Sequence, residues 1–185
     1  MKTKIILLIT VLTFGTLLLN AQIYMGKTCA ISFFSKGPIE DIAAINNSSK
    51  PILNTSTNEV AIKITIKGFE FDKKLMEEHF NEKYMESDKY PYATFVGKIN
   101  EPMDYKKEGT YKVSLTGKLT MHGVEKERTI EGIVSLKGGE ISFDSKFNVA
   151  LKDHKIEIPT LVAQNIAEVV EVTVKTTLTE FKSKK

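Results

Sequence analysis

The sequence predicts an all-β protein in which about eight antiparallel strands follow one another as a meander, together with one short helix. The first observation is that apolar and polar residues alternate along most of the chain, which is typical of strands with one buried and one wet face. The second is that the breaks between these segments are short, as at residues 107–109, 122–123 and 138–139. Short breaks favour antiparallel neighbours, because parallel strands need long crossovers.

The first strands follow from composition and turn signals. Residues 27–35 are rich in β-forming side chains and are predicted to form a strand that Pro38 ends. Residues 38–47 are predicted to form no more than a single turn or an irregular loop. A polar turn signal at residues 54–58 separates a short strand at 51–53 from the next segment.

That next segment, residues 59–69, has the clearest alternation in the chain. Val60, Ile62, Ile64 and Ile66 share one face, and lysine and threonine residues lie on the other. Strands are therefore predicted to bury one face each. The same pattern returns at residues 92–99, 111–120, 124–136, 141–149 and 169–181.

Residues 72–85 are predicted to form the helix. Asp72 is placed to act as the N-cap, because its side chain can accept hydrogen bonds from the first turn. Pro91 excludes a continuation of the helix into the following strand. A second short helical segment is predicted at residues 161–167. The helix has one mostly apolar face, formed by Leu75, Met76 and Phe80 with His79 beside them.

The N-terminal residues have the pattern of a secretory signal. Lys2 and Lys4 precede an apolar run at residues 5–19, and Ala21 is a suitable cleavage position. As a helix the run would reach only about 22 Å, against a hydrocarbon core of about 30 Å. We therefore expect residues 1–21 to be removed, leaving a domain of residues 22–185 in the periplasm or outside the cell, with no stable membrane span. Retention of the segment would instead tether the domain to a membrane.

Charge and cysteine content limit the partners. Removal of the predicted signal takes away two lysines and no acidic residue, which leaves 24 basic against 23 acidic residues. This balance gives no electrostatic basis for binding nucleic acid. The single cysteine, Cys29, cannot form an internal disulfide. It is interpreted as a small residue of the first strand, with an intermolecular disulfide as the alternative.

The sequence contains no recognisable catalytic or metal-binding motif. The three histidines form no HExxH pair, and a single cysteine cannot build a thiolate zinc site. GxSxG, GxGxxG and phosphate-binding loops are also missing from the sequence. Glu78, His79 and Glu82 share one helical turn, but a solvated helix face explains them better than a metal site. The protein is therefore predicted to be non-catalytic and to need no cofactor.

Strands that are apolar on one face can stack as two sheets or close into a barrel. Closure removes exposed edges, and a barrel of roughly eight strands either fills its interior or holds one small ligand. Small inward residues such as Gly117, Gly132 and Ser145 alternate with Phe143 and Phe147. This mixture suits an elongated slot, but it also suits a structural or protein-interaction barrel with a filled core.

Three blocks of sequence resemble the YceI-like family when they are taken together. The first is MEEHF at residues 76–80, with YMESDKYP at 84–91 and ATFVG at 93–97. The second is LTGKLTMHGV at residues 115–124. The third comprises residues 147–149, 156–159 and 166–168. The resemblance implies a lipocalin-like antiparallel β-barrel with a helix capping one mouth, and it implies an exported bacterial protein that binds isoprenoid lipids.

On this resemblance the protein would sequester or transport an isoprenoid lipid in an apolar lumen. Binding of a prenyl quinone in electron transfer is the alternative ligand assignment, and formation of a homodimer is left open. Residues 46–57 depart from the family's head-group region. The polar head group of the lipid is therefore placed only approximately, at a mouth of the barrel near His79, Tyr90 or His154. The lumen is predicted to be lined by Ile62, Ile64, Ile66, Phe95, Val113, Leu115, Leu119, Phe143, Phe147, Val172 and Val174, and the lid by Leu75, Met76 and Phe80.

Overall fold

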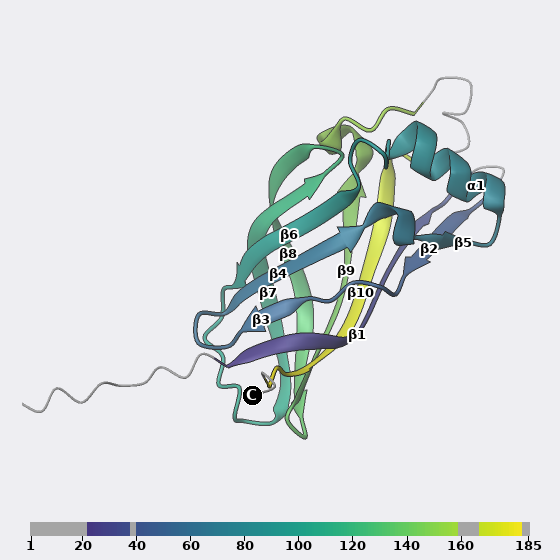
Figure 1. Cartoon of the computed structure of the whole chain (residues 1–185). Helices are drawn as coiled ribbons and strands as arrows, with labels where there is room; N and C mark the ends of the chain where they lie inside the picture. The colour runs from purple at the N-terminus through teal and green to yellow at the C-terminus, as the bar shows by residue number, and fades with distance from the viewer. Residues whose placement is uncertain (1–21, 38–39, 159–166, 183–185) are drawn as a thin grey trace, which may run out of the picture.

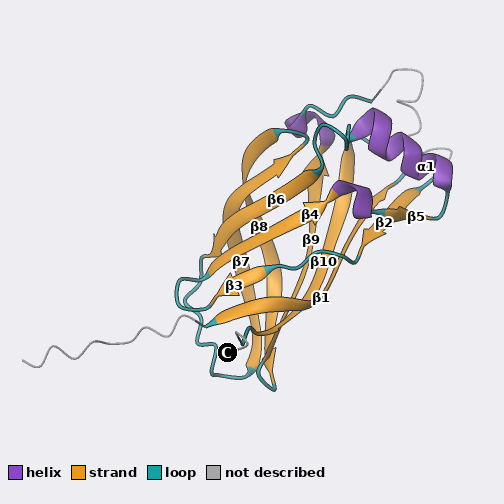
Figure 2. Ribbon diagram, viewed as in Figure 1, coloured by secondary structure: helices purple, strands orange, loops and turns teal. Residues whose placement is uncertain are grey.

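The computed structural model of the chain describes residues 22–37, 40–158 and 167–182. These residues form an antiparallel sheet that curves round on itself, with a short helix over its upper end (Figures 1 and 2). Its strands are β1 (Ile23–Ser35), β2 (Ile42–Asn46), β3 (Ile52–Asn54), β4 (Glu59–Thr65), β5 (Glu70–Phe71), β6 (Tyr92–Ile99), β7 (Gly109–Met121), β8 (Val124–Lys137), β9 (Glu140–Ala150) and β10 (Val169–Glu180).

Strand β1 closes the sheet into a barrel. One of its edges pairs with β10 from Tyr24↔Glu180 to Phe34↔Glu171. Its other edge pairs with β3 near the start of the strand and with β2 near its end. The closed ring contains eight strands, and β2 and β5 form a flap beside it. The prediction of an antiparallel barrel is therefore confirmed, and the alternative of two stacked sheets is wrong.

Strands β6 and β7 approach each other closely at a pair of glycines. Gly97 and Gly117 are cross-strand partners, and an ideal Cβ on Gly117 would lie 2.4 Å from the Gly97 Cα. The same Cβ would lie 2.9 Å from the Cζ atom of Phe95. Glycine at both positions therefore leaves room for the Phe95 ring, which packs over the pair inside the barrel.

The predicted helix is present but differs in detail. Helix α1 (Lys74–His79) continues into η2 (Phe80–Tyr84), a π-helical turn. Lys73 occupies the N-cap position and makes no side-chain capping hydrogen bond. The assignment of Asp72 as N-cap is therefore wrong. In Figure 1 the helix lies across the upper end of the barrel, as expected for a segment that covers one mouth.

Two segments have a different secondary structure from the one predicted. Residues 38–47 were expected to be irregular, yet they contain β2, whose inward positions are Ala44 and the polar Asn46. An inward asparagine removes the apolar alternation, so the strand is defined by its pairing with β1 and β5. The strand expected at residues 59–69 ends at Thr65, and Ile66–Gly68 form a 3₁₀ turn, η1. The helix predicted at residues 161–167 lies outside the described residues, apart from its last residue.

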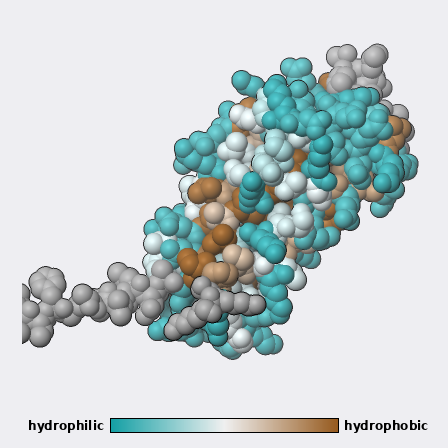
Figure 3. Space-filling model, viewed as in Figure 1, coloured by the Kyte–Doolittle hydropathy of each residue, from teal (hydrophilic) through white to brown (hydrophobic). Residues whose placement is uncertain are grey.

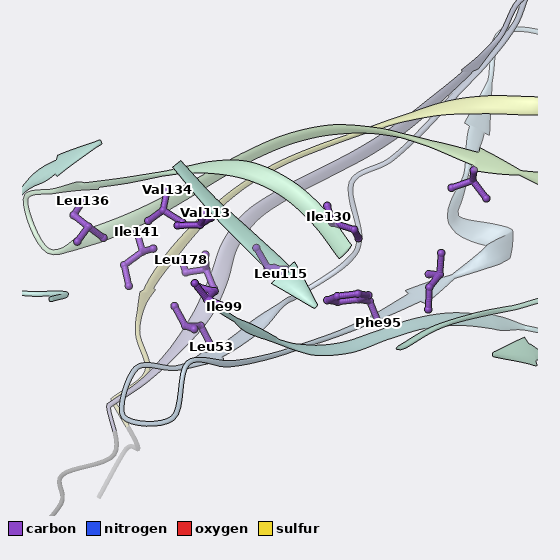
Figure 4. Packing of buried hydrophobic residues seen from close by; sticks show 12 residues of the cluster. Leu53, Phe95, Ile99, Val113, Leu115, Ile130, Val134, Leu136, Ile141 and Leu178 are labelled. Atoms are coloured by element: carbon purple, nitrogen blue, oxygen red, sulfur yellow. The ribbon is translucent and has the colours of Figure 1, made fainter. Parts of the chain in front are cut away.

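The apolar faces of the strands meet inside the barrel. Figure 4 shows Leu53 of β3, Ile99 of β6 and Leu178 of β10 pointing toward one another, and each is nearly inaccessible to solvent. The face seen in Figure 3 is mostly polar, apart from a row over β3, β4 and β6 that includes Ile52 and Val96. None of the helices in the described ranges is long and apolar enough to span a membrane.

Candidate functional site

A cavity of about 440 Å³ occupies the interior of the barrel. Its volume falls within the range of pockets that hold small organic ligands, about 300–1,000 Å³. Side chains from strands all around the barrel line it, together with residues of α1 and η2. Nearly all of these side chains are apolar. The lumen therefore contains an apolar cavity that suits a hydrocarbon ligand better than a charged one.

Most of the residues predicted for the lumen lie in the cavity wall. They come from strands that are distant in the sequence, and their alternate positions all face inward because a strand presents every second residue to the same face. Their role in binding a ligand remains a prediction. The predicted residues that line the cavity are Ile62, Ile64, Ile66, Met76, His79, Phe80, Phe95, Leu115, Leu119, Phe143, Phe147, Val172 and Val174.

The structure does not place Leu75 or Val113 in this wall. Leu75 is 61 % exposed, because Met76 and Phe80, four residues apart, share the inward face of the helix and leave Leu75 outside it. Val113 is buried in the core, but its cross-strand partner is Gly132. The Phe143 ring packs against that glycine, since an ideal Cβ on Gly132 would lie 2.3 Å from Phe143 Cε2. Phe143 thus takes the lining position next to Val113.

Two of the three head-group candidates also lie away from the cavity wall. His154 is fully buried, and its Nδ1 atom lies 3.1 Å from the Val124 carbonyl oxygen. Burial lowers the pKa of His154, and the charge of Arg128 acts in the same direction. Tyr90 instead packs its ring edge-on against His122, with 4.6 Å between ring centroids. Only His79 of the three faces the cavity.

Aromatic rings close the end of the barrel under the helix. The Phe80 ring lies 5.5 Å from Phe33, 5.6 Å from Phe69 and 5.0 Å from Phe71, measured between centroids. All four rings line the cavity. Phe33, Phe69 and Phe71 are cavity residues that the sequence did not predict, although Phe33 alternates with Ile31 on the inward face of the first strand.

The few polar groups of the wall are unevenly placed. Glu40 and His79 line the cavity near the helix, and Glu40 forms an ion pair with Lys73 just before α1. Ser35 and Thr176 also contribute, and the Thr176 hydroxyl donates to the Thr28 carbonyl at 2.7 Å. Within the described ranges, no three histidine, cysteine, aspartate or glutamate side chains cluster in a way that could hold a metal ion. The arrangement can hold an apolar body with its polar end toward the helix.

Comparisons with known proteins agree with this architecture. Residues 31–178 match the family model of the YceI-like domain. Among solved structures, a polyisoprenoid-binding domain from Saccharophagus degradans is similar, with a TM-score of 0.73 and 16 % identity over 85 % of this chain and 98 % of that one. BcnA from Burkholderia cenocepacia has a TM-score of 0.67 and 18 % identity, over 80 % and 95 % of the two chains. The YceI protein of Campylobacter jejuni has a TM-score of 0.53 and 19 % identity, over 80 % and 85 %. No curated protein matches the sequence.

Proposed function

This chain belongs to the YceI-like domain family, and on that premise we propose that it binds an isoprenoid lipid in the barrel cavity without transforming it. The ligand's hydrocarbon tail would lie along the lumen, and its polar end would lie near His79 and Glu40. Binding of this kind serves to sequester or transport the lipid. The similar Saccharophagus degradans domain is described as polyisoprenoid-binding, which supports the same ligand class here.

The observation that carries the proposal is the continuous apolar wall of the cavity. Apolar surface removed from water contributes about 25 cal/mol per Å², so a tail that buries roughly 300 Å² gains about 7.5 kcal/mol before the costs of association. The gain rises in proportion to the apolar area that the tail buries. A ligand held in this way is selected by its length and shape, because the wall offers few hydrogen-bonding groups.

We propose further that the barrel acts in the bacterial envelope, after residues 1–21 have been removed as a signal. The support is the charged start and apolar run of the sequence. The intact mass of the protein recovered from an envelope or culture fraction tests this proposal. A mass that corresponds to a chain starting near residue 22 would support the proposal. The mass of the full chain, found in the cytoplasmic fraction, would contradict it.

Mass spectrometry of a solvent extract tests the ligand assignment. Protein purified gently from bacteria should carry a long-chain prenyl species, and the mass would distinguish a prenyl quinone from a prenyl alcohol or phosphate. Val172→Glu places a charge in the cavity wall and should abolish co-purification. Val96→Glu is the matched control, because Val96 is 59 % exposed on the outside of β6.

Circular dichroism and thermal unfolding first establish that both variants are folded. Val172→Phe provides a second test, because it removes cavity volume without adding a charge, and it should reduce the bound lipid. An extract of wild-type protein that contains no apolar ligand, together with no uptake of added prenyl lipid, would overturn the proposal. Equal lipid in folded Val172→Glu and wild-type protein would show that the cavity is not the binding site.

A further inference from the structure

The barrel wall is incompletely paired between β8 and β9. Their ladder runs from Lys137↔Glu140 to Ile133↔Asp144 and ends there. On its other edge β8 stays paired with β7 as far as Met121↔Val124, and β9 stays paired with β10 as far as Val169↔Ala150. The facing edges of β8 and β9 therefore diverge toward the end of the barrel that carries η3 (Leu151–His154) and α1 (Figure 1). We call this part of the wall the seam, residues 124–132 and 145–154.

Side chains bridge the seam where a backbone ladder would otherwise continue. The Ser145 hydroxyl donates to the Glu131 carbonyl at 2.5 Å. Farther along, Arg128 Nη2 donates to the Asn148 carbonyl at 2.6 Å. At the end of the seam, His154 Nδ1 lies 3.1 Å from the Val124 carbonyl. The first two bridges occupy carbonyl oxygens on the facing edges of β8 and β9, the groups that strand pairing would have used.

The seam separates the cavity from a groove on the outside of the barrel. Ile130 on β8, and Phe147 and Val149 on β9, line the cavity on the two sides of the seam. Outside, a groove of about 750 Å³ crosses the same strands, and its lining is mostly charged or polar, with Ile133 as its exposed apolar residue. Only one layer of wall therefore lies between the apolar interior and this groove.

The bridges of the seam are single polar contacts, whereas a cluster of aromatic rings closes the barrel under η2. There Phe80 packs against three aromatic rings, and Lys73 and Lys67 form ion pairs with Glu40 and Asp88. Among the described residues, Arg128 Nη1 and His154 Nε2 at the seam are buried without a hydrogen-bond partner, as is Asn81 Oδ1 in η2. Buried polar atoms in this condition destabilise the closed arrangement relative to one in which they meet water.

We infer that the apolar tail of the ligand passes sideways through the β8–β9 seam. This inference rests on the proposed function. Opening requires the three side-chain bridges to separate and the Arg128 guanidinium to leave the Phe147 ring, while the ladders that join β8 to β7 and β9 to β10 remain intact. A flexible prenyl chain can thread through such a gap, and the head group stays outside until the tail is buried.

A reversible staple across the seam tests the route. In a Cys29→Ser background, the pair Glu131→Cys and Lys146→Cys places two outward cysteines directly beyond the last paired residues. The matched control is Ser135→Cys with Ser142→Cys, which are outward partners inside the intact ladder. Where either pair does not oxidise, dibromobimane bridges the same two cysteines. Mass spectrometry establishes that each bridge has formed.

The measured quantity is the rate at which nitrobenzoxadiazole-labelled geranylgeraniol leaves the protein for phosphatidylcholine vesicles. Bridging the seam should slow this transfer at least tenfold and leave the equilibrium affinity within threefold. Bridging the control pair should change the rate less than twofold, and reduction should restore the faster rate of the oxidised seam variant. Ser145→Ala, which removes one bridge, should speed the transfer at least threefold.

The outcomes separate this inference from the proposed function. Unbridged protein that takes up no probe overturns both. Unbridged protein that binds the probe, with equal transfer rates before and after the seam is bridged, overturns only the passage through the seam. In that case the ligand leaves at the end of the barrel that α1 covers. Lys73→Ala, which removes the ion pair to Glu40 beside the helix, would then be the variant that speeds transfer.

Discussion

The side-chain amide of Asn46 donates to the Thr65 carbonyl at 2.9 Å, which joins the end of β2 to the end of β4 across the side of the barrel. Asn46 is fully buried, and its Oδ1 atom accepts from the backbone N–H of Ser48 at 2.9 Å. An ideal Cβ on Gly68 would lie 2.8 Å from the Asn46 amide nitrogen, so glycine leaves room for it. The flap formed by β2 and β5 is thus fixed to the closed ring.

Asn46→Ala should therefore destabilise the protein. The change removes the two partly buried hydrogen bonds to the Thr65 carbonyl and the Ser48 N–H, and each contributes about 0.5–1.5 kcal/mol. We expect a fall of roughly 1–3 kcal/mol in the free energy of unfolding, measured by urea denaturation. Asn100→Ala is the control, because the side chain of exposed Asn100 donates to the Ser114 and Thr116 hydroxyls and the substitution leaves its backbone hydrogen bond to the Ser114 carbonyl in place. A similar loss in both variants would contradict this assignment.

Phe80→Ala should loosen the closure of the barrel under the helix. The ring packs against Phe33, Phe69 and Phe71, and its removal should cost about 2–4 kcal/mol of stability. Leu75→Ala, one turn earlier on the exposed face, should change stability by less than about 0.5 kcal/mol. Thermal unfolding of the two variants measures the difference. A larger effect at Leu75 than at Phe80 would mean that the helix is turned the other way.

Acid should destabilise the protein partly through His154. Burial lowers the pKa of this imidazole below its ordinary value of 6.5, so on acidification the unfolded chain takes up the proton first. The contribution to stability is complete above about pH 6.5 and is lost as the pH falls through the lowered pKa. Between pH 8 and pH 5, a range of about three pH units, the free energy of unfolding of His154→Gln should therefore fall less than that of the wild type. Equal losses, measured by urea titration at each pH, would exclude His154 as the source.

Cys29 should be unreactive in the folded protein. Its side chain is 3 % exposed, and burial raises the pKa of the thiol, which disfavours the reactive thiolate. A thiol reagent such as iodoacetamide should label it at least about a hundredfold more slowly in native buffer than in denaturant. Peptide mapping at timed intervals measures both rates. A disulfide-linked dimer on a non-reducing gel would restore the alternative of intermolecular pairing, which burial of Cys29 argues against.

The local patterns were sufficient for the class of fold and for the direction of most side chains. Alternation identifies the buried face of a strand from the strand alone, as at Ile62 and Ile64 in β4 or Val172 and Val174 in β10. Short breaks then fix antiparallel neighbours. The same reasoning failed at β2, because its inward residue Asn46 is polar and the strand is defined by its pairing with β1 and β5.

What the sequence alone determined was therefore the set of one-sided strands and the helix among them, because periodicity is a property of consecutive residues. Only the tertiary structure decided that β1 closes against β10, that Val113 is covered while Leu115 lines the cavity, and that β8 and β9 separate. These features depend on register between strands far apart in the chain and on the volume left once their side chains meet. No single segment encodes that volume.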